Sequence, residues 1–240
     1  MLVFGHRGFS GNYPENTMLA FRKAVEVGAD GIELDVHLSK DGELMVIHDE
    51  ALARTTDKEG FVCNYLRSEL EQIKASKTQN DRFDESIPSF EEYCTFASGQ
   101  KIVTNIEIKS GDWWYQDIER KTVDMVYRFG IQDRVIFSSF NWLSVVRCKS
   151  IAPEIPCGLL FAKEQDVKRV AYLAKDHGIE YLHPDFHLVD QAMVDDCRRT
   201  GVEMNVWTVN TPKEMEPLIR CKARSVISNY PDMCLKELGR

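Results

Sequence analysis

The chain alternates short apolar runs with longer amphipathic stretches along most of its length. Several runs are continuous rather than alternating, for example VIFSSF from residue 135 and CGLLF from residue 157. Continuous apolar runs are typical of parallel strands that helices cover on both faces. The runs expected to form strands are Leu2–Gly5, Gly31–His37, Ile102–Ile108, Val135–Ser139, Cys157–Phe161, Tyr181–Asp185, Glu203–Val209 and Ser225–Asn229.

The amphipathic stretches between these runs carry signals for helix ends. Glycine favours the residue after a helix because it adopts positive φ without strain, and four stretches are expected to stop at Gly28, Gly130, Gly178 and Gly201. Asn16 is expected to cap the helix that stops at Gly28. Residues 211–214, Thr-Pro-Lys-Glu, predict a capping box with proline at the first helical position.

Strands alternating with helices predict an α/β fold, namely a (β/α)8 TIM barrel. An open doubly wound sheet is the alternative, but no glycine-rich phosphate loop follows the first run. Residues 50–100 carry turn and charge signals without a convincing strand, so we expect an insertion there, after the second strand. A barrel of this length forms one unit, so residues 1–240 are expected to be a single domain.

Composition and charge narrow the possible partners and location. The net charge of −8 argues against nucleic acid, because binding it requires a basic surface. The N-terminal region lacks a secretory apolar segment, and no apolar run reaches the roughly 18 residues of a membrane span. Seven cysteines without a C-x-x-C motif are typical of reduced thiols. We therefore expect a cytoplasmic protein without stable membrane insertion.

Polar residues interrupt the first two strands where packing alone would favour apolar ones. His6 and Arg7 end the first run, and Glu33, Asp35 and His37 alternate along the second, so these three share one face. Barrel enzymes place their chemistry at such carboxyl ends of strands. Two like-charged carboxylates on one face of an apolar strand are costly, so they predict a bound cation.

The turn after the second strand predicts how His48 joins this face. Asp41-Gly42 is typical of a two-residue hairpin turn. If Lys40 then pairs with Glu43, Asp35 lies opposite His48. The imidazole of His48 would therefore lie beside the carboxylates.

The third strand completes a set of groups suited to phosphate esters. Asn105, Glu107 and Lys109 alternate on one of its faces. Three carboxylates favour one hard divalent cation, Mg²⁺ or Ca²⁺, while Arg7 and Lys109 supply positive charge for an anion. Two histidines can act as acid and base near neutral pH. Each residue alone has a structural explanation, but together they predict metal-assisted cleavage of a phosphate ester.

The motifs around these residues resemble those of the glycerophosphodiester phosphodiesterase family. They are HRG followed after five residues by PENT, then GIELDVHLSKDGELMVIHD, NIEIK, SSFN, NVWTVN and SNYPD. The resemblance spans nearly the whole chain in the family's order. It implies a distorted barrel with an insertion after the second strand, one divalent cation, and hydrolysis of glycerophosphodiesters to sn-glycerol 3-phosphate and an alcohol.

The resemblance also implies roles for individual residues. The catalytic pair is His6 and His48, and the metal ligands are Glu33, Asp35 and Glu107. The phosphate and substrate contacts are Arg7, Lys109, Trp207 and Phe140, with Glu15 and Asn16 in support. The segment Trp113-Trp114-Tyr115 is expected either to border the site or to pack on the next helix.

The expected activity is metal-dependent hydrolysis of a small-molecule glycerophosphodiester. We expect His6 to be the base and His48 the acid, with water or the neighbouring glycerol hydroxyl as the nucleophile. One alternative is a lysophospholipase or a phosphoinositide-type phospholipase on the same barrel. The other is a non-catalytic phosphodiester-binding barrel, which predicts the loss of a histidine or carboxylate. The sequence does not decide the alcohol group, the metal or the oligomeric state.

Overall fold

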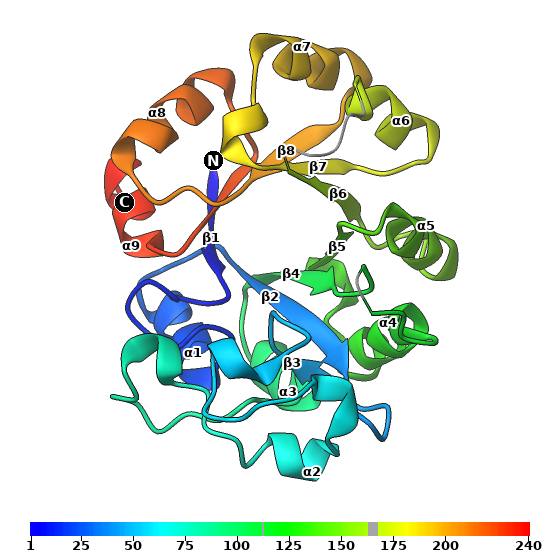
Figure 1. Cartoon of the computed structure of the whole chain (residues 1–240). Helices are drawn as coiled ribbons and strands as arrows, with labels where there is room; N and C mark the ends of the chain where they lie inside the picture. Colours follow the sequence, from blue (N-terminus) through cyan, green and yellow to red (C-terminus); the bar gives the residue numbers. More distant parts are fainter. Residues whose placement is uncertain (112, 163–167) are drawn as a thin grey trace.

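The strands of the computed structural model close into a barrel, viewed in Figure 1 with the helices outside it. The structure describes residues 1–111, 113–162 and 168–240. The barrel strands run in the order β1-β9-β8-β7-β6-β5-β4-β2, and pairing of β1 with β2 completes the ring. All pairs within the ring are parallel, and its closure by the β1–β2 pair confirms the predicted barrel and excludes the open sheet. The strands are β1 Leu2–His6, β2 Gly31–Leu38, β4 Val103–Ile108, β5 Val135–Ser139, β6 Cys157–Phe161, β7 Tyr181–Pro184, β8 Glu203–Val206 and β9 Ser225–Ser228.

Helices follow the barrel strands and cover the outer face of the ring. Across the described residues, none is both long and apolar enough to cross a membrane. The capping box at Thr211 is confirmed, because its hydroxyl accepts the Glu214 N–H and the Glu214 carboxylate accepts the Thr211 N–H. The helices are α1 Met18–Glu26, α3 Phe90–Ser98, α4 Ile118–Arg128, α5 Trp142–Ile151, α6 Val170–Asp176, α7 Gln191–Thr200, α8 Pro212–Cys221 and α9 Pro231–Glu237.

The expected cap of α1 is wrong by one residue. Thr17 caps the helix, since its hydroxyl accepts the Ala20 N–H at 3.3 Å. Asn16 has φ 54° and donates its side-chain amide to Asp35 instead. Either of these adjacent residues could cap the helix. The Thr17 hydroxyl does so, while the Asn16 amide points into the barrel toward Asp35.

The insertion after β2 has an apolar core of its own. It contains the antiparallel strand β3 (Leu44–Val46), helix α2 (Arg67–Leu70) and 3-10 turns η1 (Leu52–Arg54), η2 (Val62–Asn64) and η3 (Lys77–Gln79), and forms the cyan lobe in Figure 1. The residues of this small core are Met45, Ile47, Leu52, Val62, Leu70, Ile73, Ala75 and Ile87.

Helix α3 marks the true end of the insertion. Its buried residues Phe90 and Tyr93 join the main core, where the Tyr93 ring meets Phe21 edge-on at 4.9 Å. The helix is therefore the barrel's own connection between β2 and β4. The insertion therefore ends before residue 90 and not near residue 100 as expected. The charged residues that follow Ser89 belong to an amphipathic helix, which Ser89 caps.

The expected hairpin register between β2 and β3 is also wrong by one residue. Ser39, not Lys40, pairs with Glu43, and the Ile47 N–H donates to the Asp35 carbonyl. Gly42, with φ 76°, is the third residue of a three-residue loop and not the second residue of a two-residue turn. His48 therefore lies just beyond β3, in the connection to η1.

Apolar side chains fill part of the barrel interior below the charged residues at the carboxyl ends of the strands. Phe4, Ile136 and Ile227 form a buried layer across the middle of the barrel. One step further along the same inward-facing positions come His6 on β1 and, on neighbouring strands, Glu33 and Glu107. The apolar layer thus closes the floor beneath a polar group at the carboxyl ends of the strands.

Candidate active site

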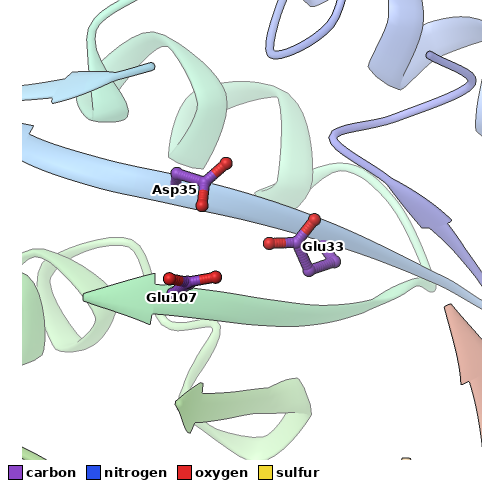
Figure 2. Close-up of side chains that lie close together, drawn as sticks. All are labelled: Glu33, Asp35 and Glu107. Atoms are coloured by element: carbon purple, nitrogen blue, oxygen red, sulfur yellow. The ribbon is translucent and has the colours of Figure 1, made fainter. Parts of the chain in front are cut away.

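Three carboxylates converge at the carboxyl end of the barrel. Glu33 and Asp35 come from β2 and Glu107 from the adjacent β4, where Glu107 is the register partner of Asp35. One oxygen from each lies within 4.8 Å of the others, and Figure 2 shows them between the two strands. All three are buried, with Asp35 fully inaccessible. The structure therefore brings together the three residues that the sequence proposed as metal ligands.

Positive and hydrogen-bonding groups surround Asp35. The Lys109 ammonium lies 3.1 Å from Asp35 Oδ1 and 2.5 Å from Glu107 Oε1, while Arg7 Nε lies 3.5 Å from Asp35 Oδ2. Asn16 donates to the same Oδ2 at 2.8 Å. Burial opposes ionisation of Asp35, but Lys109, the nearby His48 and Arg7 hold its pKa well below the usual range.

Glu33 experiences the opposite balance. Burial, and then the charges of Asp35 and Glu107, raise the pKa of Glu33 well above its ordinary value. The pKa of Glu107 is also raised, first by burial. A divalent cation would offset this repulsion, and a donor set made only of carboxylate oxygens fits Mg²⁺ or Ca²⁺ better than a softer metal.

One ring nitrogen of His6 is hydrogen-bonded, and the other makes no hydrogen bond with any residue that the structure describes. Its Nδ1 donates to the side-chain oxygen of Asn229 at 2.6 Å, and the same oxygen accepts the Ser10 hydroxyl. Nε2 therefore carries the lone pair, 3.9 Å from a Glu33 oxygen. Burial and the Arg7 charge lower the pKa of His6 to about 3, so the neutral ring can accept a proton.

His48 is held in a similar way from the other side of the site. Its Nδ1 donates to Asp49 Oδ1 at 2.5 Å. Its carbonyl oxygen accepts from His37 Nε2 at 2.9 Å, and His37 Nδ1 in turn accepts the Tyr115 hydroxyl. His37 thus shares the inward face expected of it but anchors the backbone of His48.

One pocket is lined by both histidines, by two of the three carboxylates and by an aromatic wall. Trp207 meets the Phe140 ring edge-on at 5.6 Å, and its indole N–H donates to the His183 carbonyl at 2.8 Å. The charged residues come from β1, β2 and β4, whereas the aromatic rings come from the ends of β5 and β8. The lining residues are His6, Arg7, Glu33, His48, Asn105, Glu107, Phe140, Leu160, Trp207 and Ile227.

The three aromatic residues after β4 lie in three different surroundings. Tyr115 is buried and packs on His37. Trp113 lies against Phe61 of the insertion, with ring centres 5.5 Å apart. Trp114 is 61% exposed and faces the Arg147 guanidinium. Packing therefore accounts for the tyrosine, while the two tryptophans remain partly exposed.

Sequence reasoning missed three residues that hold the site. Asp49 and Asn229 orient the rings of His48 and His6, and they lie in the segments IHD and SNYPD. Arg54 binds Asp49 and also Glu15, which itself accepts from Arg7 at 2.7 Å. No motif or periodicity indicated Arg54, because it lies in the irregular insertion.

The fold and the site together define a barrel hydrolase of phosphate esters. The pattern of the Glycerophosphoryl diester phosphodiesterase family matches residues 6–233. The chain belongs to this family and is a phosphoric diester hydrolase. This membership sets aside the expectation of a non-catalytic barrel.

Similar proteins cover almost the whole chain. A glycerophosphodiester phosphodiesterase of Caldanaerobacter subterraneus subsp. tengcongensis is 38% identical over 96% of this chain and 95% of its own length. The structure of an Oleispira antarctica phosphodiesterase in complex with the product sn-glycerol-3-phosphate superposes with a TM-score of 0.92, at 27% identity over 100% of this chain and 97% of that one. The human lysophospholipase D GDPD1 is 25% identical, covering 94% of this chain and 82% of its own length.

Proposed function

We propose that this chain hydrolyses glycerophosphodiesters to sn-glycerol 3-phosphate and an alcohol, using one divalent cation and the pair His6 and His48. The observation that carries the proposal is one pocket lined by both histidines, Glu33 and Glu107, with Asp35 buried within reach of these two carboxylates. The solved relative in complex with sn-glycerol-3-phosphate supports this choice of product. The natural partner is then a small-molecule glycerophosphodiester.

Glu33, Asp35 and Glu107 would hold the cation, Mg²⁺ or Ca²⁺. When bound, a divalent cation polarises a phosphoryl oxygen and favours developing negative charge. Lys109 lies between two of the ligands and keeps them ionised and oriented. Arg7 and Lys109 also supply the positive charge that an anionic diester requires.

The two histidines divide the proton transfers. His6 Nε2 takes the proton of the nucleophile, either water or the neighbouring glycerol hydroxyl, because Nδ1 is already bonded to Asn229. His48 gives a proton to the leaving alkoxide from Nε2, while Asp49 holds Nδ1–H. The Asp49 carboxylate fixes the orientation of the ring, so that Nε2 is the nitrogen left to face the leaving group.

Release of sn-glycerol 3-phosphate from a panel of diesters tests the function. The panel contains glycerophosphocholine, glycerophosphoethanolamine, glycerophosphoglycerol and glycerophosphoinositol, each assayed with Mg²⁺, with Ca²⁺ and with excess chelator. We expect product with a cation, none after chelation, and recovery when the cation is restored. Full turnover after exhaustive chelation would contradict the metal requirement.

A lysophospholipid in the same panel tests the second candidate function. The relative named lysophospholipase D and the exposed apolar rings of Phe61 and Trp113 favour including it. Turnover of the lysophospholipid above that of every water-soluble diester would assign the chain to this activity instead.

Recognition of glycerol should involve Trp207. The aromatic wall suits the C–H face of glycerol, while its hydroxyls meet the charged wall. We expect bis(p-nitrophenyl) phosphate to be a poor substrate despite its better leaving group, since polar partners of the missing hydroxyls stay unpaired. Trp207→Ala should lower kcat/KM for glycerophosphodiesters about tenfold, because aromatic contacts contribute roughly 1 kcal/mol or more.

The hydroxyl-free diester serves as the control for this variant. Its residual turnover should change less than that of the glycerophosphodiesters when Trp207 is replaced. Equal or better kcat/KM for the hydroxyl-free diester in the unmodified protein would point to a generic phosphodiesterase.

A further inference from the structure

Arg54 joins two parts of the site that the barrel strands do not connect. It ends the turn η1 of the insertion, and its guanidinium lies between two carboxylates. Toward one side, Nε and Nη2 donate to Asp49 at 2.5 and 3.0 Å. Toward the other, Nη1 and Nη2 donate to Glu15 at 2.7 and 2.8 Å. Both contacts are the paired, planar kind that a guanidinium forms best.

Each carboxylate bound by Arg54 also holds a residue of the pocket. Asp49 Oδ1 accepts both Arg54 and the Nδ1–H of His48. Glu15 Oε1 accepts both Arg54 and the Arg7 guanidinium. The Asp49 carboxylate therefore links Arg54 to His48, and the Glu15 carboxylate links Arg54 to Arg7.

The charge of Arg54 favours the ionised forms of both carboxylates. Burial raises the pKa of Asp49, but hydrogen bonds from His48 and Arg54 outweigh it and lower the pKa below its ordinary range. Glu15 shows the same balance, with Arg54 as the largest opposing contribution. Both carboxylates therefore stay ionised as acceptors, and without Arg54 each would lose two of its donors.

We propose that Arg54 is a positioning residue for the hydrolysis, holding the ring of His48 through Asp49 and the guanidinium of Arg7 through Glu15. This inference rests on the function proposed above. A side chain that is 42% exposed adds little stability through any single ion pair. Its effect is orientational, because its paired bonds limit rotation of two carboxylates that each also hold a pocket residue. The insertion thereby contributes to catalysis without touching the substrate.

The first test compares Arg54→Ala with a matched variant of the same insertion. Arg67 also pairs with three carboxylates, those of Glu43, Glu71 and Glu91, but none of them contacts the pocket residues named above. We expect Arg54→Ala to lower kcat about 10- to 100-fold, the usual cost of losing a supporting partner in an active site. Arg67→Ala should leave kcat nearly unchanged at a similar change in Tm.

The second test separates positioning from general damage through the leaving group. Glycerophosphocholine needs a proton on its departing alkoxide, whereas the p-nitrophenyl ester of glycerol 3-phosphate releases a stable phenolate. If Arg54 acts through His48, Arg54→Ala should lower kcat much more for the first substrate, as His48→Ala should. Arg54→Lys should restore only part of the loss, because an ammonium cannot bind both carboxylates in pairs. Added guanidinium ion should recover part of the activity of Arg54→Ala.

The outcomes distinguish this inference from the proposed function. Equal losses on both substrates, or unchanged kcat in Arg54→Ala, would overturn the role of Arg54 while the unmodified protein still releases sn-glycerol 3-phosphate. If the unmodified protein releases none from either ester, the proposed function fails first and the inference fails with it.

Discussion

Asp35→Asn is expected to abolish both divalent-cation binding and turnover. Asp35 is the most buried of the three carboxylates. It pairs with Lys109 and Arg7 and accepts a hydrogen bond from Asn16. The neutral amide keeps the volume of the side chain but removes the negative charge that pairs with Lys109 and Arg7. Since a catalytic cation contributes several kcal/mol to the transition state, kcat/KM should fall on the order of 10³-fold or more.

Calorimetric titration with Mg²⁺ and the release assay measure the two effects of Asp35→Asn separately. Asp196→Asn is a matched control, because Asp196 is also largely buried and paired with arginines but lies on α7. It should bind Mg²⁺ and turn over substrate like the unmodified protein. Wild-type Mg²⁺ affinity in Asp35→Asn, with circular dichroism showing a folded chain, would remove Asp35 from the metal site.

The second large effect is expected from the two histidines. His6→Ala and His48→Ala should each lower kcat/KM on the order of 10²–10⁴-fold, the usual contribution of a general acid or base. If the two rings act on the same bond-breaking step, as proposed above, the double variant should lose much less than the product of the single losses. Steady-state kinetics of the three variants on one glycerophosphodiester provide the comparison.

His177→Ala is the control for the histidine variants. His177 is exposed at the end of α6, and among the described residues its ring bonds only to the Leu173 carbonyl of its own helix. It should retain full activity. A loss of only a few-fold in His6→Ala or His48→Ala, or strictly multiplicative losses in the double variant, would show that the pair does not share a catalytic step.

The barrel strands and the cluster of carboxylates could be predicted because both depend on local periodicity. A strand presents alternate residues to one face, so Glu33 and Asp35 share a side whatever surrounds them. Parallel strands end at the same edge of a barrel, so Glu107 had to lie near them once the order of strands was known.

The register between β2 and β3 was harder to predict, because it depends on the geometry of one turn. The Asp41-Gly42 pair fits either a two-residue or a three-residue loop, and the choice depends on the dihedral angles of Lys40 and Asp41. The shift moved Asp35 opposite Ile47, yet His48 still reaches the pocket from the connection beyond β3.

The sequence by itself determined the repeating strands and helices, the inward residues of each strand and the inventory of charged groups at one end. These follow from alternation and apolar patterning, which act over a few neighbouring residues. Only the tertiary structure decided that Asn16 supports Asp35, that Asn229 and Asp49 select the free nitrogen of each histidine, and that Arg54 links the insertion to the barrel. The physical reason is that such bonds depend on where whole segments meet, and a side-chain hydrogen bond forms only within a few tenths of an ångström of its ideal length.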